Sequence, residues 1–277
     1  QLFSQTEECK KLGVKVADTV KMLNDAYNEN KVIILEGTQG TLLDLHLGHY
    51  PFCTSRQTTA SAWVTEAGLS PALNYEVVLV VRAMPIRVAG NSGPLLKETS
   101  WEVVAERVNS ELVDLGMPPK VGPRSLSKYR RSLAMAAEKL GLPDTNFHLW
   151  SAEQRTKFSE QLSNVHKLTF ESMEEYDVKE LKNLFEMTTV TKKLRRIARL
   201  DINELKYAVQ INRPDYLVVT FVNYLFPAIW GLTTWKQILN SPRGRDVVKF
   251  IKDLEKETGV PVRYINTAPN TLIKVRQ

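Results

Sequence analysis

The chain has 277 residues, of which 43% are hydrophobic and 25% charged, a composition typical of a folded protein and not of a disordered one. No apolar run reaches the roughly 18 to 20 residues of a membrane span and the N-terminus lacks a signal pattern, so we expect a soluble protein of the cytoplasm. The formal net charge of +6 favours an anionic partner, whether a nucleotide, a nucleic acid or an acidic metabolite.

The first elements predicted are a helix and a buried strand. Apolar residues recur at helical spacing at Leu12, Val16, Val20, Leu23 and Tyr27. Residues 32–35 are apolar and mostly β-branched, which predicts a buried strand over residues 31–35, and we expect the helix to cover its sheet. The polar stretch 36–41 then offers flexible backbone amides, and 50–56 adds hydroxyls and a cation. Together these groups suit a phosphorylated small molecule.

A second helix and a second strand follow. Residues 58–68 are rich in small side chains with a glycine stop, which predicts a helix that buries Ala62 and Val64. Residues 77–81 form a continuous apolar run, typical of a parallel strand buried on both faces. Gly90, Gly93 and Pro94 mark a turn after it. From residue 101 to about 182 the sequence becomes helical and charged, without a constellation that predicts catalysis or a metal site.

Residues 186–201, EMTTVTKKLRRIARLD, combine threonines with a basic run on a predicted loop. Hydroxyls and guanidinium groups in this order predict a clamp for carboxylate and phosphate. The alternative is a nucleic-acid interface, but the interleaved aromatic residues of a single-strand reader are absent from the run.

The last part of the chain predicts the carboxyl edge of a parallel sheet. Residues 216–220 predict a buried strand, and 221–224 follow at the edge where open α/β sheets bind ligands. An amphipathic helix is predicted around residues 247–254, and a last strand at 260–265 leads into the turn 266–269.

These motifs together resemble the adenylosuccinate synthetase family. EGTQGTLLD and YPFCTSR are similar to the family's EGAQGTLLD and YPYVTS, RVAGNSGP to its RVGxGPFPTE turn, and TTVTKKLRR to its TTTGRxRRxGWLD loop. The likeness covers about residues 16–105 and 185–269, and YPFCTSR is especially like the phage and archaeal branch that includes 2-aminoadenylosuccinate synthetase.

The resemblance implies an α/β fold in which a mostly parallel central sheet is flanked by helices, as in proteins related to the P-loop NTPases. On this basis residues 1–102 form the first part of the α/β core. Residues 103–182 are a helical insertion, and residues 183–277 form the C-terminal part of the core.

The resemblance also implies a function in purine nucleotide biosynthesis, namely a ligase that joins L-aspartate to IMP or dGMP with hydrolysis of a nucleoside triphosphate. Purine monophosphate binding then falls to Gln39, Gly40, Thr54, Arg87 and Lys193. Aspartate binding falls to Thr188, Thr189, Val190, Thr191, Lys192 and Arg195. Nucleoside triphosphate binding falls to Arg196, Asn223, Tyr224, Thr267 and Pro269.

One departure from the family concerns catalysis. The sequence has no GDEGKGK-like loop and no matching downstream histidine, the groups that in the family hold Mg²⁺ and perform acid–base chemistry. We therefore assign no catalytic or metal residue in this chain and expect the Mg²⁺ ligands outside it. Either the chain is the C-terminal part of a longer synthetase, which its start at Gln1 favours, or it is an inactive nucleotide-binding subunit or sensor. A homodimer is expected because the family dimerises.

The other departure concerns the nucleotide base. Phe221 and Asn223 stand where the family has TKLD, whose aspartate pairs with guanine. A neutral amide can both donate to and accept from an adenine edge, so we expect ATP or dATP in place of GTP.

Overall fold

The computed structural model describes residues 6–13, 16–189 and 191–276, which form two compact units, Gln1–Glu76 and Val77–Gln277. The helices of the first unit are α1 (Glu7–Lys11), α2 (Thr19–Asn28), the short η2 (Thr41–Leu43) and α3 (Ala60–Glu66). Asp18 caps α2 and Thr59 caps α3. The helix predicted at 58–68 is confirmed, and it buries Ala62 and Val64 as expected.

Two predictions for this unit are wrong. Residues 31–35 form no strand, and Val32 and Ile34 are 90% and 84% exposed. Extended backbone becomes a strand only when a neighbour supplies hydrogen bonds, and the described part of this unit contains no other strand. The first helix was expected from Leu12, but Gly13 adopts a positive φ of 68° and α2 begins at Thr19 without burying any residue.

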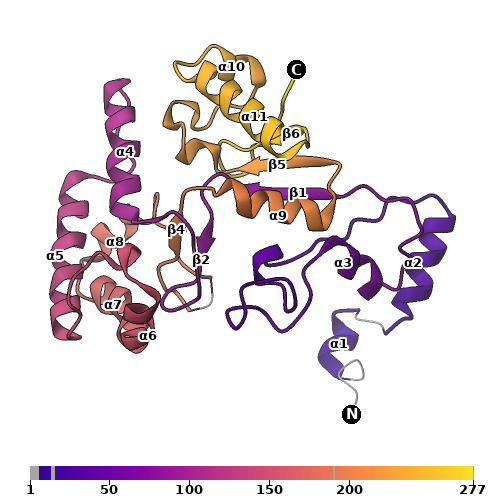
Figure 1. The fold of residues 1–277 in the computed structure, drawn as a ribbon, viewed down its shortest axis with the longest axis horizontal. Coiled ribbons are helices and arrows are strands. Elements are labelled where there is room, and N and C mark those ends of the chain that lie inside the picture. Colours follow the sequence, from indigo (N-terminus) through magenta and orange to yellow (C-terminus); the bar gives the residue numbers. More distant parts are fainter. Residues whose placement is uncertain (1–5, 14–15, 190, 277) are drawn as a thin grey trace. The chain divides into compact units, whose positions relative to one another are not determined.

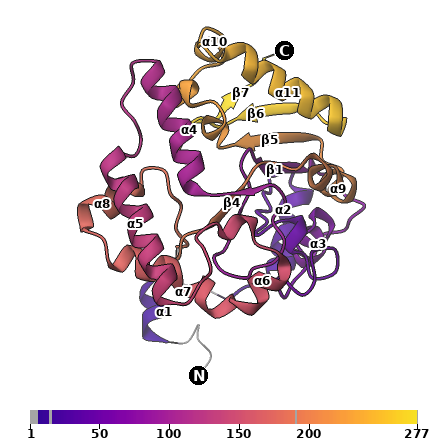
Figure 2. The same ribbon diagram turned by 60° about the vertical axis from the view of Figure 1, so that its left-hand side comes forward.

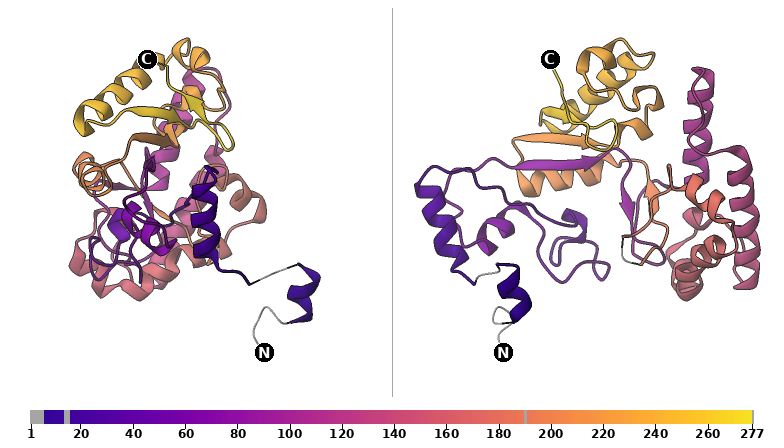
Figure 3. Two further views of the ribbon diagram at one scale, coloured as in Figure 1. Left: turned by 90° about the vertical axis from the view of Figure 1, so that its right-hand side faces the viewer. Right: turned by 180° about the vertical axis from the view of Figure 1, so that it is seen from behind.

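A four-stranded sheet forms the centre of the second unit (Figures 1 and 3). Its order is β1 (Val78–Arg82), β5 (Tyr216–Thr220), β6 (Val262–Ile265) and β7 (Ile273–Lys274). The first three strands are parallel and β7 is antiparallel. Leu217 and Val219 of β5 are fully buried and share a core with α9 (Ile202–Asn212) and α11 (Gly244–Thr258). The predicted α/β class is confirmed.

The strand predicted at 77–81 is present, but it is not buried on both faces. Val78 and Val80 of β1 are 40% and 63% exposed. The reason is position, because β1 lies at the edge of the sheet as the structure describes it and has β5 on one side only.

A second, antiparallel sheet has the order β2 (Ile86–Arg87), β4 (Arg196–Ala198), β3 (Glu98–Thr99). Strand β4 falls within the segment expected to be a loop, which therefore ends sooner than predicted. The short helices η4 (Val222–Tyr224) and η5 (Pro227–Ile229) and helix α10 (Trp235–Leu239) lie between β5 and α11.

The segment between β3 and β4 is helical, as expected (Figure 2). Its helices surround a second core. Its helices are α4 (Trp101–Asp114), α5 (Pro123–Lys139), η3 (Phe147–Leu149), α6 (Ala152–Lys157), α7 (Ser159–Glu171) and α8 (Glu175–Leu181). Tyr129 lies at the centre, 1% exposed, and packs edge-on against Phe185 with 5.1 Å between ring centroids. None of the helices in the described residues is both long and apolar enough to span a membrane.

The central position of Leu217 leads to a stability prediction. Replacing Leu217 with alanine leaves a cavity between β5 and the covering helices, and should lower the free energy of unfolding by about 2 to 5 kcal/mol. The control is Val80→Ala on the exposed face of β1, which should cost less than about 1 kcal/mol. Urea denaturation followed by circular dichroism measures both. Equal losses in the two variants would contradict the burial pattern.

Candidate functional site

The polar loop of the first unit is organised by the carboxylate of Asp44, which is 1% exposed. Its Oδ1 accepts hydrogen bonds from the amides of His46 and Leu47 at 2.9 and 3.0 Å, and Oδ2 accepts from the amide of Thr58 at 2.5 Å. Burial acts to raise the pKa of Asp44, but the three amide donors outweigh it and the pKa lies below its usual value. The ionised carboxylate therefore ties 44–47 to residue 58.

The predicted purine-binding residues of this unit meet around that loop. The amide of Thr54 donates to the Leu43 carbonyl at 2.7 Å, and the amide of Leu43 donates to the Gly40 carbonyl at 2.9 Å. Thr58 Oγ1 also donates to the Gly40 carbonyl, at 2.9 Å. Gln39 has a positive φ of 60° and an exposed side chain. Gln39, Gly40 and Thr54 thus belong to one cluster, while Arg87 and Lys193 lie in the second unit.

In the second unit, loops from the carboxyl ends of neighbouring strands meet at one edge of the sheet. The amide of Val222 after β5 donates to the Asn266 carbonyl after β6 at 3.2 Å, and the amide of Ala83 after β1 donates to the Thr220 carbonyl at 2.8 Å. Thr267 is fully buried and donates through Oγ1 to the Leu232 carbonyl at 2.6 Å, whereas Pro269 is exposed.

The two residues that replace the family's TKLD lie differently at this edge. The Phe221 ring is half-buried, with the Arg82 guanidinium 3.5 Å from its centroid. Asn223 is 3% exposed, and its Oδ1 has no hydrogen-bond partner among the described residues. Tyr224 packs as a core residue against Trp101 and Trp230, and burial raises the pKa of its hydroxyl.

The basic stretch forms a tight hairpin. Met187 and Leu194 pair as an isolated bridge, and the amide of Thr188 donates to the Lys193 carbonyl at 2.8 Å. The Thr188 hydroxyl accepts from the Lys193 amide at 2.9 Å and lies 2.6 Å from the Thr191 hydroxyl. The Thr188 hydroxyl is therefore already engaged in hydrogen bonds within the hairpin.

The other predicted aspartate-binding side chains divide by exposure. Thr189, Thr191 and Lys192 are exposed, and Lys193 and Arg195 are half-buried. Val190 lies outside the described residues.

The next cation, Arg196, is held inside the protein. Its guanidinium donates to both carboxylate oxygens of Glu98, at 2.7 and 2.6 Å, and to the Gly93 carbonyl at 2.7 Å. Arg87 is 9% exposed and donates to the Pro94 carbonyl at 2.6 Å. Burial lowers the pKa of Arg87, and the neighbouring Arg196 lowers it further. Both cations thus fix the turn 90–94.

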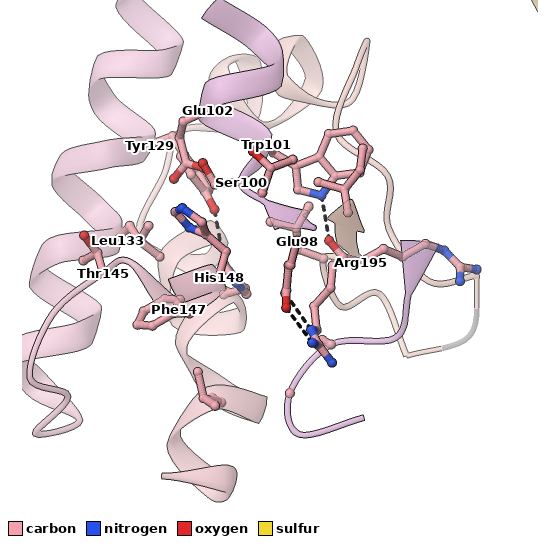
Figure 4. A pocket seen from close by; sticks show the side chains of 18 of the residues that line it. Glu98, Ser100, Trp101, Glu102, Tyr129, Leu133, Thr145, Phe147, His148 and Arg195 are labelled. Atoms are coloured by element: carbon pink, nitrogen blue, oxygen red, sulfur yellow. Dashed lines mark hydrogen bonds and ion pairs between the residues drawn. The ribbon is translucent and has the colours of Figure 1, made fainter. Parts of the chain in front are cut away.

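Three residues that the sequence analysis did not select contribute to this arrangement. The Trp101 indole donates to the Arg195 carbonyl at 2.6 Å, and Figure 4 shows the Arg195 side chain extending away from this bond. Arg155 donates to the same Glu98 oxygen as Arg196 does, at 2.8 Å. Glu98 follows the predicted glycine turn closely in the sequence, so that turn could have identified Glu98 as a candidate. For Arg155, on α6, only the tertiary fold brings it to Glu98.

Among the described residues, no three His, Cys, Asp or Glu side chains come together in a way that could hold a metal ion.

The amide bonds of Asp44 lead to a prediction for the first unit. Asp44→Asn keeps the shape but removes the charge, and exchange of the Thr58 amide with solvent should accelerate by about tenfold, as expected for loss of a charge-assisted hydrogen bond. Since the folded pKa is depressed, the wild-type contribution is present above the ordinary aspartate value of 3.8 and is lost as the pH falls through the lower folded value. Hydrogen exchange followed by NMR checks both, with Asp18→Asn at the α2 cap as control. An unchanged Thr58 rate would refute the role of Asp44.

Comparison with known proteins identifies the family. The model of the adenylosuccinate synthetase family matches residues 1–230. The adenylosuccinate synthetase of Thermococcus onnurineus is 24% identical over 269 residues, which cover 97% of this chain and 55% of that protein. The enzyme of Archaeoglobus fulgidus is 25% identical over 269 residues, covering 97% and 56%. The chain therefore spans about half the length of the curated relatives it matches.

Two solved structures share the fold. Cyanophage S-2L succinoaminodeoxyadenylate synthetase (PurZ), bound to dGMP and to dATP as an energy donor, superposes with a TM-score of 0.54 and 20% identity, covering 98% of this chain and 55% of that one. Fully ligated adenylosuccinate synthetase from Plasmodium falciparum gives a TM-score of 0.56 at 18% identity, covering 97% and 56%. With the family model matching most of its length and both structures sharing its α/β fold, this chain belongs to the adenylosuccinate synthetase family.

Proposed function

We propose that the chain is part of a ligase that joins L-aspartate to a 6-oxopurine nucleotide, IMP or dGMP, with hydrolysis of a nucleoside triphosphate. Family membership supports the reaction. The coverage of about half of each relative supports the proposal that the phosphate loop and the Mg²⁺ ligands are supplied from outside these 277 residues. Residues 103–182 are then a helical insertion between 1–102 and 183–277, and the assembled enzyme is a homodimer.

The observation that supports an adenine nucleotide is the buried side chain of Asn223, whose Oδ1 has no hydrogen-bond partner among the described residues. A buried carbonyl oxygen without a partner costs about 1 to 3 kcal/mol, so such a group in a folded protein calls for a ligand or a functional reason. Asn223 lies where strand-end loops converge, the usual place for a nucleotide in an open α/β sheet. An adenine amino group can donate to Oδ1 while the amide N–H₂ donates to a ring nitrogen. Because Asn223 is 3% exposed, base binding requires the adjoining loop to open.

The proposed reaction transfers the γ-phosphoryl group to the purine 6-oxygen, after which the aspartate amine forms the C–N bond and inorganic phosphate leaves. The accessible hairpin groups Thr189, Lys193 and Arg195 would bind the aspartate and nucleotide anions and oppose the negative charge of the transferring group. Arg87 and Arg196 would fix the 90–94 turn beside them. The proposed preference for ATP or dATP agrees with the solved structure of cyanophage PurZ, which contains dATP as an energy donor.

The nucleotide proposal predicts a preference that one substitution should reverse. The wild-type protein should bind ATP or dATP more tightly than GTP, whereas Asn223→Asp should favour GTP, because a carboxylate accepts from both guanine donors. The shift in relative affinity should be about five- to 150-fold. Competition titrations of the three nucleotides, performed on the complete enzyme, measure it. The control is Asn240→Asp, at the exposed end of α10. GTP binding at least as tightly as ATP to the wild type would overturn the assignment.

The purine monophosphate site predicts a second result. Replacing Gln39 and Thr54 together with alanine should weaken binding of IMP or dGMP by about tenfold or more, the loss expected for two hydrogen bonds. Stability should change little, because Gln39 is exposed and the Thr54 bond in the loop is made by its backbone amide. Isothermal titration measures the affinity, and Gln57→Ala, exposed in the same loop, is the control. Unchanged affinity in the double variant would remove these residues from the site.

A further inference from the structure

A cavity of about 60 Å³ lies between the second sheet and the helical segment, and its lining includes Arg195 and Arg196 of the basic stretch (Figure 4). Its apolar wall includes Leu133, Phe147 and Leu162. The volume suits a compact polar group or a few water molecules and is far below the several hundred Å³ typical of drug-sized ligand pockets. A ligand of this cavity must therefore be small.

Arg155 provides donors at one end of the cavity. The residue is 8% exposed, and its Nη2 donates to Glu98 Oε2 at 2.8 Å and to the Phe147 carbonyl at 2.5 Å. Its Nε and Nη1 meet no acceptor in the part of the chain that the structure describes. Both nitrogens keep some accessible surface, and Arg155 lines the cavity. Three N–H donors of a buried guanidinium are thus open to a ligand.

The charge at this end of the cavity is positive. Glu98 is the carboxylate that both Arg155 and Arg196 contact, so one carboxylate compensates two guanidinium groups. Burial lowers the pKa of Arg155, and Glu98 acts against that shift while Arg196 adds to it. Both guanidinium groups keep their protons, because arginine does not lose its proton in proteins. The cluster therefore carries one uncompensated positive charge in a poorly solvated place, which an anion would stabilise.

The opposite end of the cavity has a different character. Glu102 lies beside Tyr129 in Figure 4, away from Glu98, and helps to raise the pKa of the Tyr129 hydroxyl after burial itself. Burial lowers the pKa of His166 to about 4, so the ring is neutral at pH 7 and shares a 3.2 Å hydrogen bond with Tyr129. An anion is consequently expected at the Arg155 end only.

We infer that this cavity binds a compact oxyanion, either a phosphate or a carboxylate group, through Arg155. The open N–H groups of Arg155 can bind two oxygens of such a group at once. The inference does not depend on the proposed ligase activity. Its effect would reach the basic hairpin, because the same cluster contains Arg196 and because the Trp101 indole, at the cavity wall, holds the Arg195 carbonyl.

The test is calorimetric titration of this chain with inorganic phosphate and, separately, with acetate. We expect saturable binding to one site for at least one anion. The anion that binds shows whether the natural ligand carries a phosphate or a carboxylate group. Arg155→Met should raise Kd by about tenfold or more, because it removes charge-assisted hydrogen bonds. Arg130→Met is the matched control, since Arg130 is exposed on α5 and pairs only with Glu106 in the described structure. It should bind as the wild type does.

A second variant separates anion binding from a purely structural role. Glu98→Gln removes the compensating charge, so it should tighten anion binding by about tenfold, although it weakens the internal cluster. A structural role alone predicts no such gain.

Hydrogen exchange on the wild-type protein tests the inference without relying on a variant that must fold. Phosphate or acetate should protect amides within residues 98–102 and 147–156 and, through Trp101, near Arg195. The inference is overturned if neither anion saturates up to about 10 mM, if Arg155→Met binds as tightly as the wild type, if Glu98→Gln gains no affinity, or if the protected amides lie elsewhere.

Discussion

The parallel pairing of β1 with β5 and of β5 with β6 is the constraint on which the second unit depends. In parallel strands the carboxyl ends lie at one edge of the sheet, so the segments after Arg82, Thr220 and Ile265 must emerge together. The fully buried Leu217 and Val219 hold β5 at the centre between its neighbours. The residues expected from the sequence to bind the nucleoside triphosphate follow these strands in four cases, Asn223, Tyr224, Thr267 and Pro269, whereas Arg196 lies on β4 of the other sheet.

A buried carboxylate plays the corresponding part in the second sheet. Glu98 on β3 contacts Arg196 on β4 and Arg155 on α6, so it joins the glycine turn, the basic hairpin and the helical segment. Removing one partner of a buried ion pair is costly because the other is left uncompensated. The helical segment is therefore more than a covering of the core, since it fixes the base of the hairpin and leaves the side chains near the tip accessible.

The hairpin illustrates how one basic run can hold residues of different roles. Lys193 and Arg195 remain partly accessible, whereas the Arg196 guanidinium donates its hydrogen bonds to Glu98 and to the Gly93 carbonyl. Alternation along an extended backbone explains the contrast between Arg195 and Arg196, because successive side chains point to opposite faces. Leu194 and Ile197, on either side of these two arginines, are both buried in the core of the helical segment.

Residue order alone was enough to predict the elements whose pattern is local. Apolar runs at 77–81, 216–220 and 260–265 predicted β1, β5 and β6, and helical spacing predicted α11, because period and burial follow directly from residue order. The grouping of Gln39, Gly40 and Thr54 in one loop could also be expected. Tertiary contacts were needed to establish that residues 31–35 form no strand, since strand formation needs a partner that local sequence does not name. They were needed as well to bring Arg155 to Glu98 across 57 residues and to bury Asn223 with an oxygen that has no hydrogen-bond partner in the described part of the chain, because such arrangements arise from packing between distant segments.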